Sequence, residues 1–426
     1  MKLNKKIVEL KEIFYKDENN NIVLNIFWNS LYIAFFLLPL GINLPTPFFI
    51  VSIVLGCTNI FKSNKRFLND NKALLLFPLY FVVMLISLIY TTNFLDGLAL
   101  LERSLTLLLF PIVFLFVKED ALTVRKLFDF LLAGLIVSFF INLSIAGYNS
   151  LSEINEGITL NAINNGWNYF INSEFSKLIN SSYVSIYILL VLSFYLKNEI
   201  KTKTQFILVI ILFLYLFLST SIAAYLILTI MCLLLIFKIV DKQKKYSMII
   251  MFFLGLIVFL NNPRLFDFHN MKTESENMKK YNITTSEKLR ILSWKTSIEL
   301  ISEAPLLGYG IGDANDVLNE RYKKLGYLDN YEQQYNAHNQ FLQTWLQTGI
   351  VGIGVLICIF ILLAVRMRRS PNEFSVFLIL FISLFFESML VRFNGIVFFS
   401  IIGPLLLKKR SILSSRIIRN ENLLNN

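Results

Sequence analysis

The sequence is poor in the side chains that most enzymes use for chemistry. Its 426 residues include two histidines and three cysteines, and charged residues make up 16% of it. Cys57, Cys232 and Cys358 fall in apolar runs without metal-ligand spacing, which favours packing over redox or zinc chemistry. The polar connections hold no Asp-x-Asp pair, and the chain has no nucleotide-binding motif. The sequence therefore predicts neither a metal site nor a cofactor, and any group that is transferred must come from a donor that is already activated.

Long apolar runs dominate the chain. Hydrophobic residues make up 55% and aromatic residues 15% of it, and its mean hydropathy is +0.60. Runs of about 20 apolar residues are what a bilayer core requires of a helix. We therefore expect an all-α polytopic membrane protein with about twelve transmembrane helices. The expected spans are 22–40, 45–61, 73–91, 98–117, 127–147, 178–196, 205–218, 221–238, 246–260, 349–366, 374–390 and 394–407.

Lysine and arginine mark every second connection between these spans. The basic connections begin near residues 62, 118, 197, 238, 366 and 408, after spans two, four, six, eight, ten and twelve. This alternation follows the positive-inside rule, so both termini are expected in the cytoplasm. The net charge of +11 is then a consequence of topology and not a sign of nucleic-acid binding. The first twenty residues are too polar for a signal peptide, so the first span is expected to be an uncleaved anchor.

Two connections are much longer than the others, and both are expected on the outer side. The first covers about 148–177, and the second, about 261–348, carries ten basic and eleven acidic residues. Connections of this length are usually functional or disordered. The expected division is a cytoplasmic segment at 1–21, a membrane region with nine spans at 22–260, a helical catalytic loop at 261–348, three spans at 349–407 and a cytoplasmic tail at 408–426.

Helix start and stop signals argue against disorder in the second connection. Thr284 and Glu287 have the spacing of a capping box, and Pro305 stops the helix that follows near residue 303. Asp313 is expected to cap a further helix that ends near Gly326.

Arg290 lies near the start of the first of these helices. Arg290, Trp294, Ser297 and Ile301 follow one another at i, i+4, i+7 and i+11, so they share a face. A guanidinium close to free backbone N–H groups can hold a diphosphate through two parallel hydrogen bonds. The alternative is a surface arginine that is paired with Glu287.

Two further motifs have a structural and a functional interpretation. GYGIG at 308–312 lacks the spacing of a phosphate loop, so a tight turn with positive φ is favoured over an anion-binding nest. His338 is expected to start the last helix of the loop, near residue 336, with Phe341, Leu342 and Trp345 on one stripe. It is either a packed or capping histidine or a group for proton transfer near neutral pH.

Four charged residues lie at the outer ends of spans. Glu102 and Arg103 belong to the fourth span, Glu387 to the eleventh, and Arg392 to the turn that follows. Charges near spans are costly and often functional, although a carboxylate can simply neutralise a neighbouring arginine. Transporters place such charges at the membrane midplane, so this clustering favours an enzyme at the membrane surface over a transporter or flippase.

Four stretches of the chain together are similar to one known family. They are Arg290 with Trp294, PLLGYGIGD at 305–313, AHNQFLQTWLQTG at 337–349, and FFESMLVRFNGIVFF at 385–399. In these stretches the chain resembles the O-antigen ligase family, which also contains polysaccharide polymerases and protein O-oligosaccharyltransferases.

The resemblance implies a GT-C-type glycosyltransferase of the bacterial inner membrane with its site on the periplasmic face. Such an enzyme moves a glycan from undecaprenyl diphosphate to an acceptor hydroxyl, with inversion and without a metal ion. The implied partners are this lipid-linked glycan, an acceptor that is lipid A core or a growing polysaccharide, and membrane lipid. Arg290 would hold the diphosphate, and His338 would act as base or positioning group. The implied substrate-binding residues are Arg103, Trp294, Asp313, Asn339, Gln340, Glu387 and Arg392.

One position departs from the pattern of that family. Family members often carry a Ser-Arg pair in an outer turn near the middle of the chain, where this sequence has Ser221 followed by Ile222. A second phosphate clamp is therefore absent there, and Arg103 or Arg392 is the expected replacement. The sequence does not distinguish a ligase for lipid A core from a polymerase of repeat units.

Overall fold

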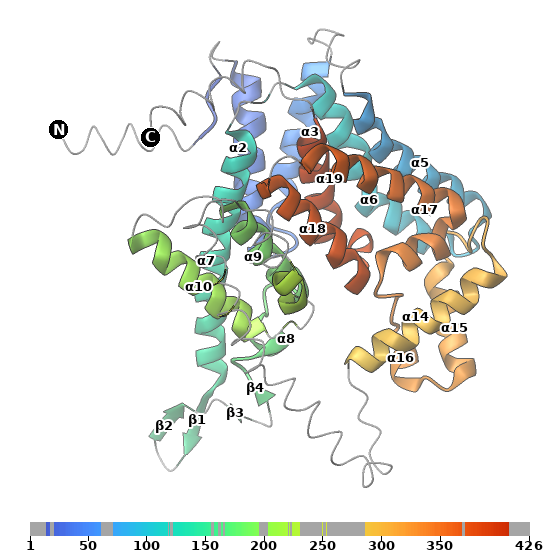
Figure 1. Cartoon of the computed structure of the whole chain (residues 1–426). Coiled ribbons are helices and arrows are strands. Elements are labelled where there is room, and N and C mark those ends of the chain that lie inside the picture. Colours follow the sequence, from blue (N-terminus) through green and yellow to red (C-terminus); the bar gives the residue numbers. More distant parts are fainter. Residues whose placement is uncertain are drawn as a thin grey trace.

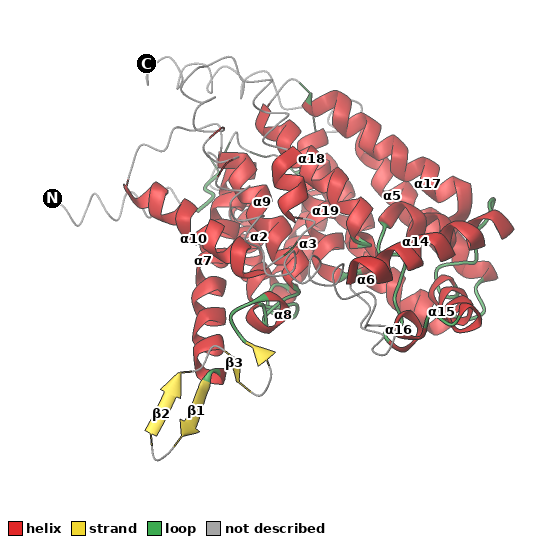
Figure 2. Cartoon of the chain, turned by 60° about the horizontal axis from the view of Figure 1, so that its bottom comes forward, coloured by secondary structure: helices red, strands yellow, loops and turns green. Residues whose placement is uncertain are grey.

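The structure is a computed structural model, and it describes residues 14–17, 21–60, 71–117, 119, 122–154, 157–160, 163–164, 167–195, 203–219, 221, 224–230, 249, 253, 286–368 and 371–408. These residues are mostly helical (Figures 1 and 2). The helices before residue 220 are α2 (Ile22–Leu37), η1 (Leu38–Leu40), α3 (Thr46–Ile60), η2 (Lys72–Leu75), α5 (Leu76–Ser87), η3 (Leu88–Tyr90), α6 (Phe94–Phe116), α7 (Thr123–Asn149), α8 (Asn172–Phe175), α9 (Ser181–Tyr195) and α10 (Lys203–Ser219). The later helices are α14 (Ser286–Glu303), α15 (Ala314–Leu325), α16 (Leu328–Glu332), α17 (Gln340–Met367), α18 (Pro371–Phe386), η5 (Met389–Val391) and α19 (Phe393–Leu407).

Within the described residues, five helical stretches are long and apolar enough to cross a membrane: Ile22–Leu40, Lys72–Tyr90, Phe94–Phe116, Thr123–Asn149 and Gln340–Met367. Five shorter apolar helices accompany them: Thr46–Thr58, Ser181–Phe194, Lys203–Ser219, Glu373–Phe386 and Phe393–Leu407. The protein is therefore a helical, polytopic membrane protein. The expected span at 246–260 and most of that at 221–238 lie outside the described residues.

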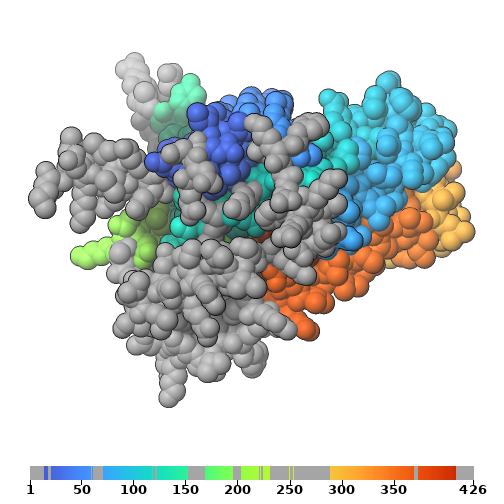
Figure 3. Space-filling view, turned by 90° about the horizontal axis from the view of Figure 1, so that it is seen from above, coloured from blue at the N-terminus to red at the C-terminus, as the bar shows by residue number. Residues whose placement is uncertain are grey.

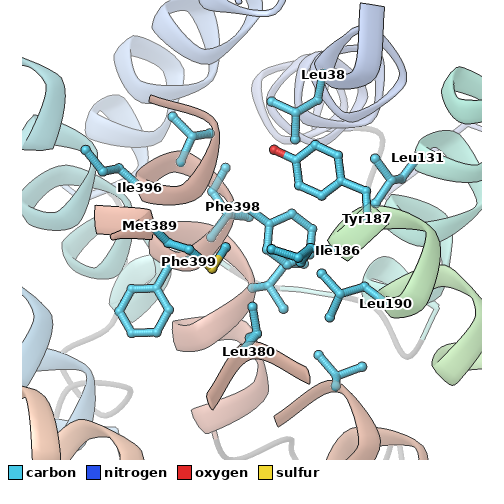
Figure 4. Close-up of a cluster of buried hydrophobic side chains, with 14 of the residues drawn as sticks. Leu38, Leu131, Ile186, Tyr187, Leu190, Leu380, Met389, Ile396, Phe398 and Phe399 are labelled. Atoms are coloured by element: carbon cyan, nitrogen blue, oxygen red, sulfur yellow. The ribbon is translucent and has the colours of Figure 1, made fainter. Parts of the chain in front are cut away.

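The apolar helices pack around one buried core. α2 packs on α3 and α7, α5 on α6 and α17, α9 on α18, and α19 on α6. Figure 4 shows the centre of this core, where Tyr187 and Ile186 of α9 meet Phe398 of α19 and Leu380 of α18. Lipid is as apolar as these side chains, so close packing and hydrogen bonds between helices must provide the stability. The Tyr187 hydroxyl, for example, donates to the main-chain carbonyl of Asn394 at 3.0 Å.

Two short β-hairpins correct the expectation of an entirely helical chain. They lie in the first long connection, where β1 (Leu151–Ile154) pairs antiparallel with β2 (Gly157–Leu160), and β3 (Ile163–Asn164) with β4 (Trp167–Asn168). Ser152, Thr159 and the neighbouring polar residues give this segment no helical period, so pairing of short strands satisfies its backbone. Figures 1 and 2 show the hairpins beyond the end of α7, projecting from the helical bundle.

The second long connection forms a helical subdomain, α14 to α16. In Figures 1 and 2 it lies at the same end of the bundle as the hairpins, under α17 and α5. The expected helix from about 285 to 303 is confirmed as α14, and the expected helix that ends near Gly326 is confirmed as α15. The capping box of Thr284 and Glu287 lies outside the side chains that the structure describes. Seen from the opposite end, α17 runs along the rim of the molecule beside α5 (Figure 3).

Asp313 joins this subdomain to the membrane helices. Its two carboxylate oxygens accept hydrogen bonds from the main-chain N–H groups of Thr92 and Asn93, both at 2.7 Å. Asn93 caps α6, and its side-chain amide also donates to Asp316 at 2.8 Å. Asp313 occupies the N-cap position of α15, as expected, but its side chain makes no capping hydrogen bond to that helix. Asp313 instead fixes the subdomain to the turn between η3 and α6.

The GYGIG motif is the tight turn that the sequence favours. Gly308 and Gly310 have φ values of 68° and 91°. Gly312 lies so close to the carbonyl of Asn93 that a Cβ would collide with it. The N–H of Tyr309 donates to the carbonyl of Leu346 at 2.7 Å. Glycine at 308–312 therefore allows close contact with α5, α6 and α17, and these contacts explain the motif without an anion.

We predict that D313A loosens the contact between the subdomain and the bundle. The variant removes two charge-assisted hydrogen bonds, which contribute about 1.5–3 kcal/mol each in typical proteins. Hydrogen exchange of residues 91–93 and 308–316 should therefore accelerate, and the thermal unfolding midpoint should fall. E320Q is the matched control, because Glu320 is an exposed carboxylate of α15, the helix that follows Asp313. Equal exchange in D313A and E320Q would contradict this account.

Candidate functional site

Glu387 is the centre of a buried charged cluster. It directly follows α18, three residues before the expected end of that span, and is 7% exposed. Its Oε1 lies 3.5 Å from Nδ1 of His338, and its Oε2 lies 3.9 Å from a terminal nitrogen of Arg290. The cluster therefore joins α14, the segment before α17 and the end of α18. The structure thus brings together the two residues expected to be catalytic.

Arg290 is the fifth residue of α14, just after its first turn. Its side chain is mostly buried and points to Glu387. The alternative pairing with Glu287 concerns a side chain outside the described part of the chain. On the shared face that the sequence indicated, Ser297 and Ile301 are buried and Arg290 and Trp294 are partly buried.

His338 has an unusual backbone conformation for a residue other than glycine. Its φ is 44°, a region that such residues seldom adopt and that is common at functional sites. The expectation that it starts the helix is corrected, because Asn339 is the N-cap of α17 and His338 precedes it. Its N–H donates to the Asn336 side chain at 2.9 Å, and its carbonyl accepts from the indole of Trp294 at 3.2 Å. The ring of Tyr335 packs edge-on against the imidazole.

The surroundings of Glu387 keep its carboxyl group ionised. Burial raises the pKa of this group, but the nearby imidazole of His338 lowers it, as do the charges of Arg290 and Arg392. The net direction is a pKa below the ordinary value of 4.5. The carboxylate therefore keeps its negative charge at neutral pH and can orient both of its partners, Arg290 and His338.

A small pocket opens beside Arg290 and Glu387. Its wall is formed by Ser182, Ile186, Ser221, Ala224, Ile227, Arg290, Ser383, Phe386 and Glu387. Ser221, which stands where the resembling family often has its Ser-Arg pair, therefore faces the same space as Arg290. Ser182 and Ser383 were missed in the sequence, where a serine near the end of an apolar span gives no distinguishing signal.

Two further arginines lie near this end of the bundle. Arg103 of α6 donates a long hydrogen bond, 3.5 Å, to the carbonyl of Val391. Arg392 follows directly and is close enough to Glu387 to lower its pKa. Both arginines, and Glu102 beside Arg103, are exposed. The outer-end charges that the sequence singled out thus belong to one region.

Three expected substrate-binding residues have side chains that are occupied within the protein. Asp313 binds the turn at Thr92 and Asn93. Asn339 accepts hydrogen bonds from two N–H groups in the first turn of α17. Gln340 is fully buried, accepts from the Leu390 N–H at 2.7 Å and donates to Thr344. These contacts assign all three a structural part, and substrate contact by them stays a prediction.

The described residues contain no group of three or more His, Cys, Asp or Glu side chains that could hold a metal ion. What the cluster offers is a guanidinium and an imidazole on either side of one carboxylate. This arrangement can bind an anion and accept a proton within one small region.

Comparison with known proteins gives two matches. Residues 207–357 match the family model described as O-antigen ligase. This match supports an O-antigen ligase family assignment. The matched region contains Arg290 and His338, whereas Glu387, Arg103 and Arg392 lie outside it. The superfamily consists of membrane glycosyltransferase-like enzymes and includes both ligases and polymerases.

The second match is an uncharacterized protein of Haemophilus influenzae, which is 24% identical over 127 residues. The match covers 29% of this chain and 32% of the relative, so it spans only about a third of either protein.

We predict a pH-dependent stability difference between the wild type and E387Q. Because the pKa of Glu387 is lowered in the folded protein, its stabilising effect is present above the ordinary value of 4.5 and is lost as pH falls through the lowered value. The thermal midpoint of E387Q should therefore lie below that of the wild type at neutral pH. The difference should shrink below pH 4.5.

E320Q again serves as the control, because Glu320 is exposed and forms no ion pair with the described residues, so its loss should change the thermal midpoint little. An E387Q difference that stays constant from neutral to acid pH would show that ion pairing of Glu387 does not stabilise the fold.

Proposed function

We propose that this protein transfers a glycan from undecaprenyl diphosphate to an acceptor hydroxyl, and that it is an O-antigen ligase that uses lipid A core. The observation that carries this proposal is the cluster of Arg290, His338 and Glu387 from three segments of the chain. The family match supports it, because it covers the two residues with the proposed chemical roles.

In the proposed reaction the acceptor oxygen attacks the anomeric carbon as the bond from that carbon to the diphosphate oxygen breaks. Arg290 holds the diphosphate and stabilises the charge that develops on it. His338 accepts the proton of the acceptor hydroxyl through its neutral imidazole, and Glu387 orients the side chains of Arg290 and His338. Attack opposite the leaving group inverts the anomeric centre. The reaction needs no metal ion or nucleotide, because the donor arrives activated.

The remaining site residues have supporting roles in this proposal. Arg290 supplies one positive charge to the diphosphate. Arg392, with Arg103 beside it, supplies the second, because the turn at Ser221 has no arginine. Trp294 positions His338 through its hydrogen bond to the carbonyl of that residue. Asp313, Asn339 and Gln340 hold the segments around the site in place through their contacts within the protein.

We also propose the topology that the sequence indicates. It has twelve spans of the GT-C type, both termini in the cytoplasm, and residues 261–348 as a catalytic loop on the periplasmic face of the inner membrane. The position of α14–α16 and of the hairpins at one end of the bundle supports this topology (Figure 1).

A polymerase that lengthens the glycan on its lipid carrier is the second candidate, because the matched superfamily contains both activities. The chemistry at Arg290 and His338 would be the same, and the acceptor alone would differ.

Glycan transfer by the purified protein in lipid would test the proposal. The reaction would contain undecaprenyl-diphosphate glycan and lipid A core, and products of the wild type and of H338A would be separated by size. We predict that the wild type glycosylates lipid A core and that H338A does not, because it lacks the group that accepts the proton.

The same experiment distinguishes the other outcomes. Longer glycan on the carrier would identify a polymerase. No transfer from a donor and acceptor that another enzyme can use would contradict both candidates. An arm with EDTA should retain full activity, whereas loss with EDTA and recovery with Mg²⁺ would contradict the metal-independent mechanism.

We predict that R290K loses most activity, on the order of 10²-fold, as for other removed transition-state hydrogen-bond donors. Lysine keeps the charge, but it cannot make the two parallel hydrogen bonds of a guanidinium. R321K is the matched control, because Arg321 of α15 also binds carboxylates, those of Glu299 and Glu303, outside the cluster. Near-normal turnover by R290K would remove Arg290 from the diphosphate site.

A further inference from the structure

The turn between α14 and α15 exposes two large apolar side chains. Leu306 is 67% exposed and Leu307 is 61% exposed. Both follow Pro305, which ends α14, and both precede the glycine-rich turn that contacts the bundle. A single exposed leucine is ordinary in water, but adjacent ones that belong to a larger apolar surface indicate an apolar partner.

All three main-chain carbonyls of residues 305–307 have hydrogen-bond partners within the protein. The carbonyl of Pro305 accepts from the indole N–H of Trp345 at 2.9 Å. The N–H of Ile350 donates to the carbonyls of Pro305 and Leu306, at 3.2 and 3.1 Å. The carbonyl of Leu307 accepts from the hydroxyl of Tyr90 at 2.7 Å. An exposed turn in water does not need such partners, whereas in lipid an unsatisfied carbonyl is costly. The turn thus presents apolar side chains outward and keeps its carbonyls satisfied within the protein.

The two side-chain donors, Trp345 and Tyr90, are of the residue types that mark the surface of a bilayer. Tryptophan and tyrosine are enriched at the level of the lipid headgroups, where one part of the ring is in apolar surroundings and the other reaches polar groups. Trp345 lies four residues before the kink of α17 at Gly349, and Tyr90 ends the apolar stretch Lys72–Tyr90. Both are therefore at the boundary of membrane-spanning helices.

The exposed leucines continue the exposed apolar surface of two candidate spans. Ile350 and Val351 of α17 are about half exposed, and the N–H of Ile350 itself binds the turn. Ile86 and Ile89, next to Tyr90, are also exposed, Ile89 to 84%. α17 runs along the rim of the molecule (Figure 3), where a bilayer would surround it. The turn thus adjoins the exposed apolar faces of two candidate spans.

We propose that the turn at residues 305–307 is immersed in the leaflet beside α14–α16, with Leu306 and Leu307 among the lipid acyl chains. This contact anchors the end of α14 to the membrane surface. The helix that carries Arg290 is then held at a fixed depth, where a group attached to a lipid carrier would lie. The proposal depends on the membrane position of α5 and α17 and stays valid for either transferase activity.

Spin-label accessibility in nanodiscs of phosphatidylethanolamine and phosphatidylglycerol would test it. Single labels are placed in L306C, L307C, I350C and L328C, in a chain whose Cys57, Cys232 and Cys358 are replaced by serine. Oxygen concentrates in the bilayer, and a nickel chelate stays in water. I350C is the reference for lipid. L328C is the matched reference for water, because Leu328 is equally exposed, 61%, and its helix, α16, packs on α14 and α15.

We predict that L306C and L307C resemble I350C, with a ratio of oxygen to nickel collisions several-fold above that of L328C. A ratio equal to that of L328C would show that the turn lies in water and would overturn the proposal. Low collision rates with both reagents would also overturn it, because a second copy of the chain or another protein would then cover the leucines.

A second measurement keeps all natural cysteines. The fluorescence added by L306W should be quenched by lipids brominated on the acyl chain, and the fluorescence added by L328W should not. Equal quenching of the two variants would contradict immersion of the turn, independently of the spin-label result.

Discussion

The buried carboxylate of Glu387 sets a condition that the rest of the site must satisfy. Removing an ionised carboxylate from water costs on the order of several kcal/mol unless opposite charges and hydrogen-bond donors compensate. At 7% exposure, Glu387 has Arg290 near one oxygen and His338 near the other. These partners come from α14 and from the segment before α17, so the carboxylate stays ionised only where α18 ends beside both. The charge of one residue thus couples the position of three segments.

Each of these segments is also held by a bond between a side chain and a main-chain group. Trp294 of α14 donates to the carbonyl of His338, and Gln340 at the start of α17 accepts from the N–H of Leu390 beyond α18. Asp313 ties the subdomain to α6 through the amides at its start. Such contacts limit the movement of the groups that face Glu387, which is what a preorganised site requires. Residues that resemble substrate ligands in the sequence can therefore support a site without touching its ligand.

The sequence predicted the features that depend on short-range pattern. Apolar runs located the helices that the structure describes, and Pro305 and Gly326 located the ends of α14 and α15 within a residue or two. The partner of Asp313 could not be predicted, because its amides lie some 220 positions away in the chain. Nor could the left-handed backbone of His338, since histidine has no local preference that requires it. The roles of Asn339 and Gln340 were also hidden, because a conspicuous polar residue before a span is compatible with a cap and with a ligand contact.

The positions of the arginines explain how this chain can lack the arginine that the family it resembles often has after the serine in the outer turn. Ser221 lines the pocket beside Arg290, so the turn without arginine faces the same space as Arg290. Arg103, Arg290 and Arg392 lie at this end of the bundle, together with Glu102 and Glu387. Arginine stays charged at any physiological pH, so these three positive charges do not depend on titration. In the proposed reaction, the second positive charge for the diphosphate does not come from the turn at Ser221. It comes from Arg392 in the α18–α19 connection and from Arg103 in α6. The region still has the positive sign that a diphosphate leaving group requires.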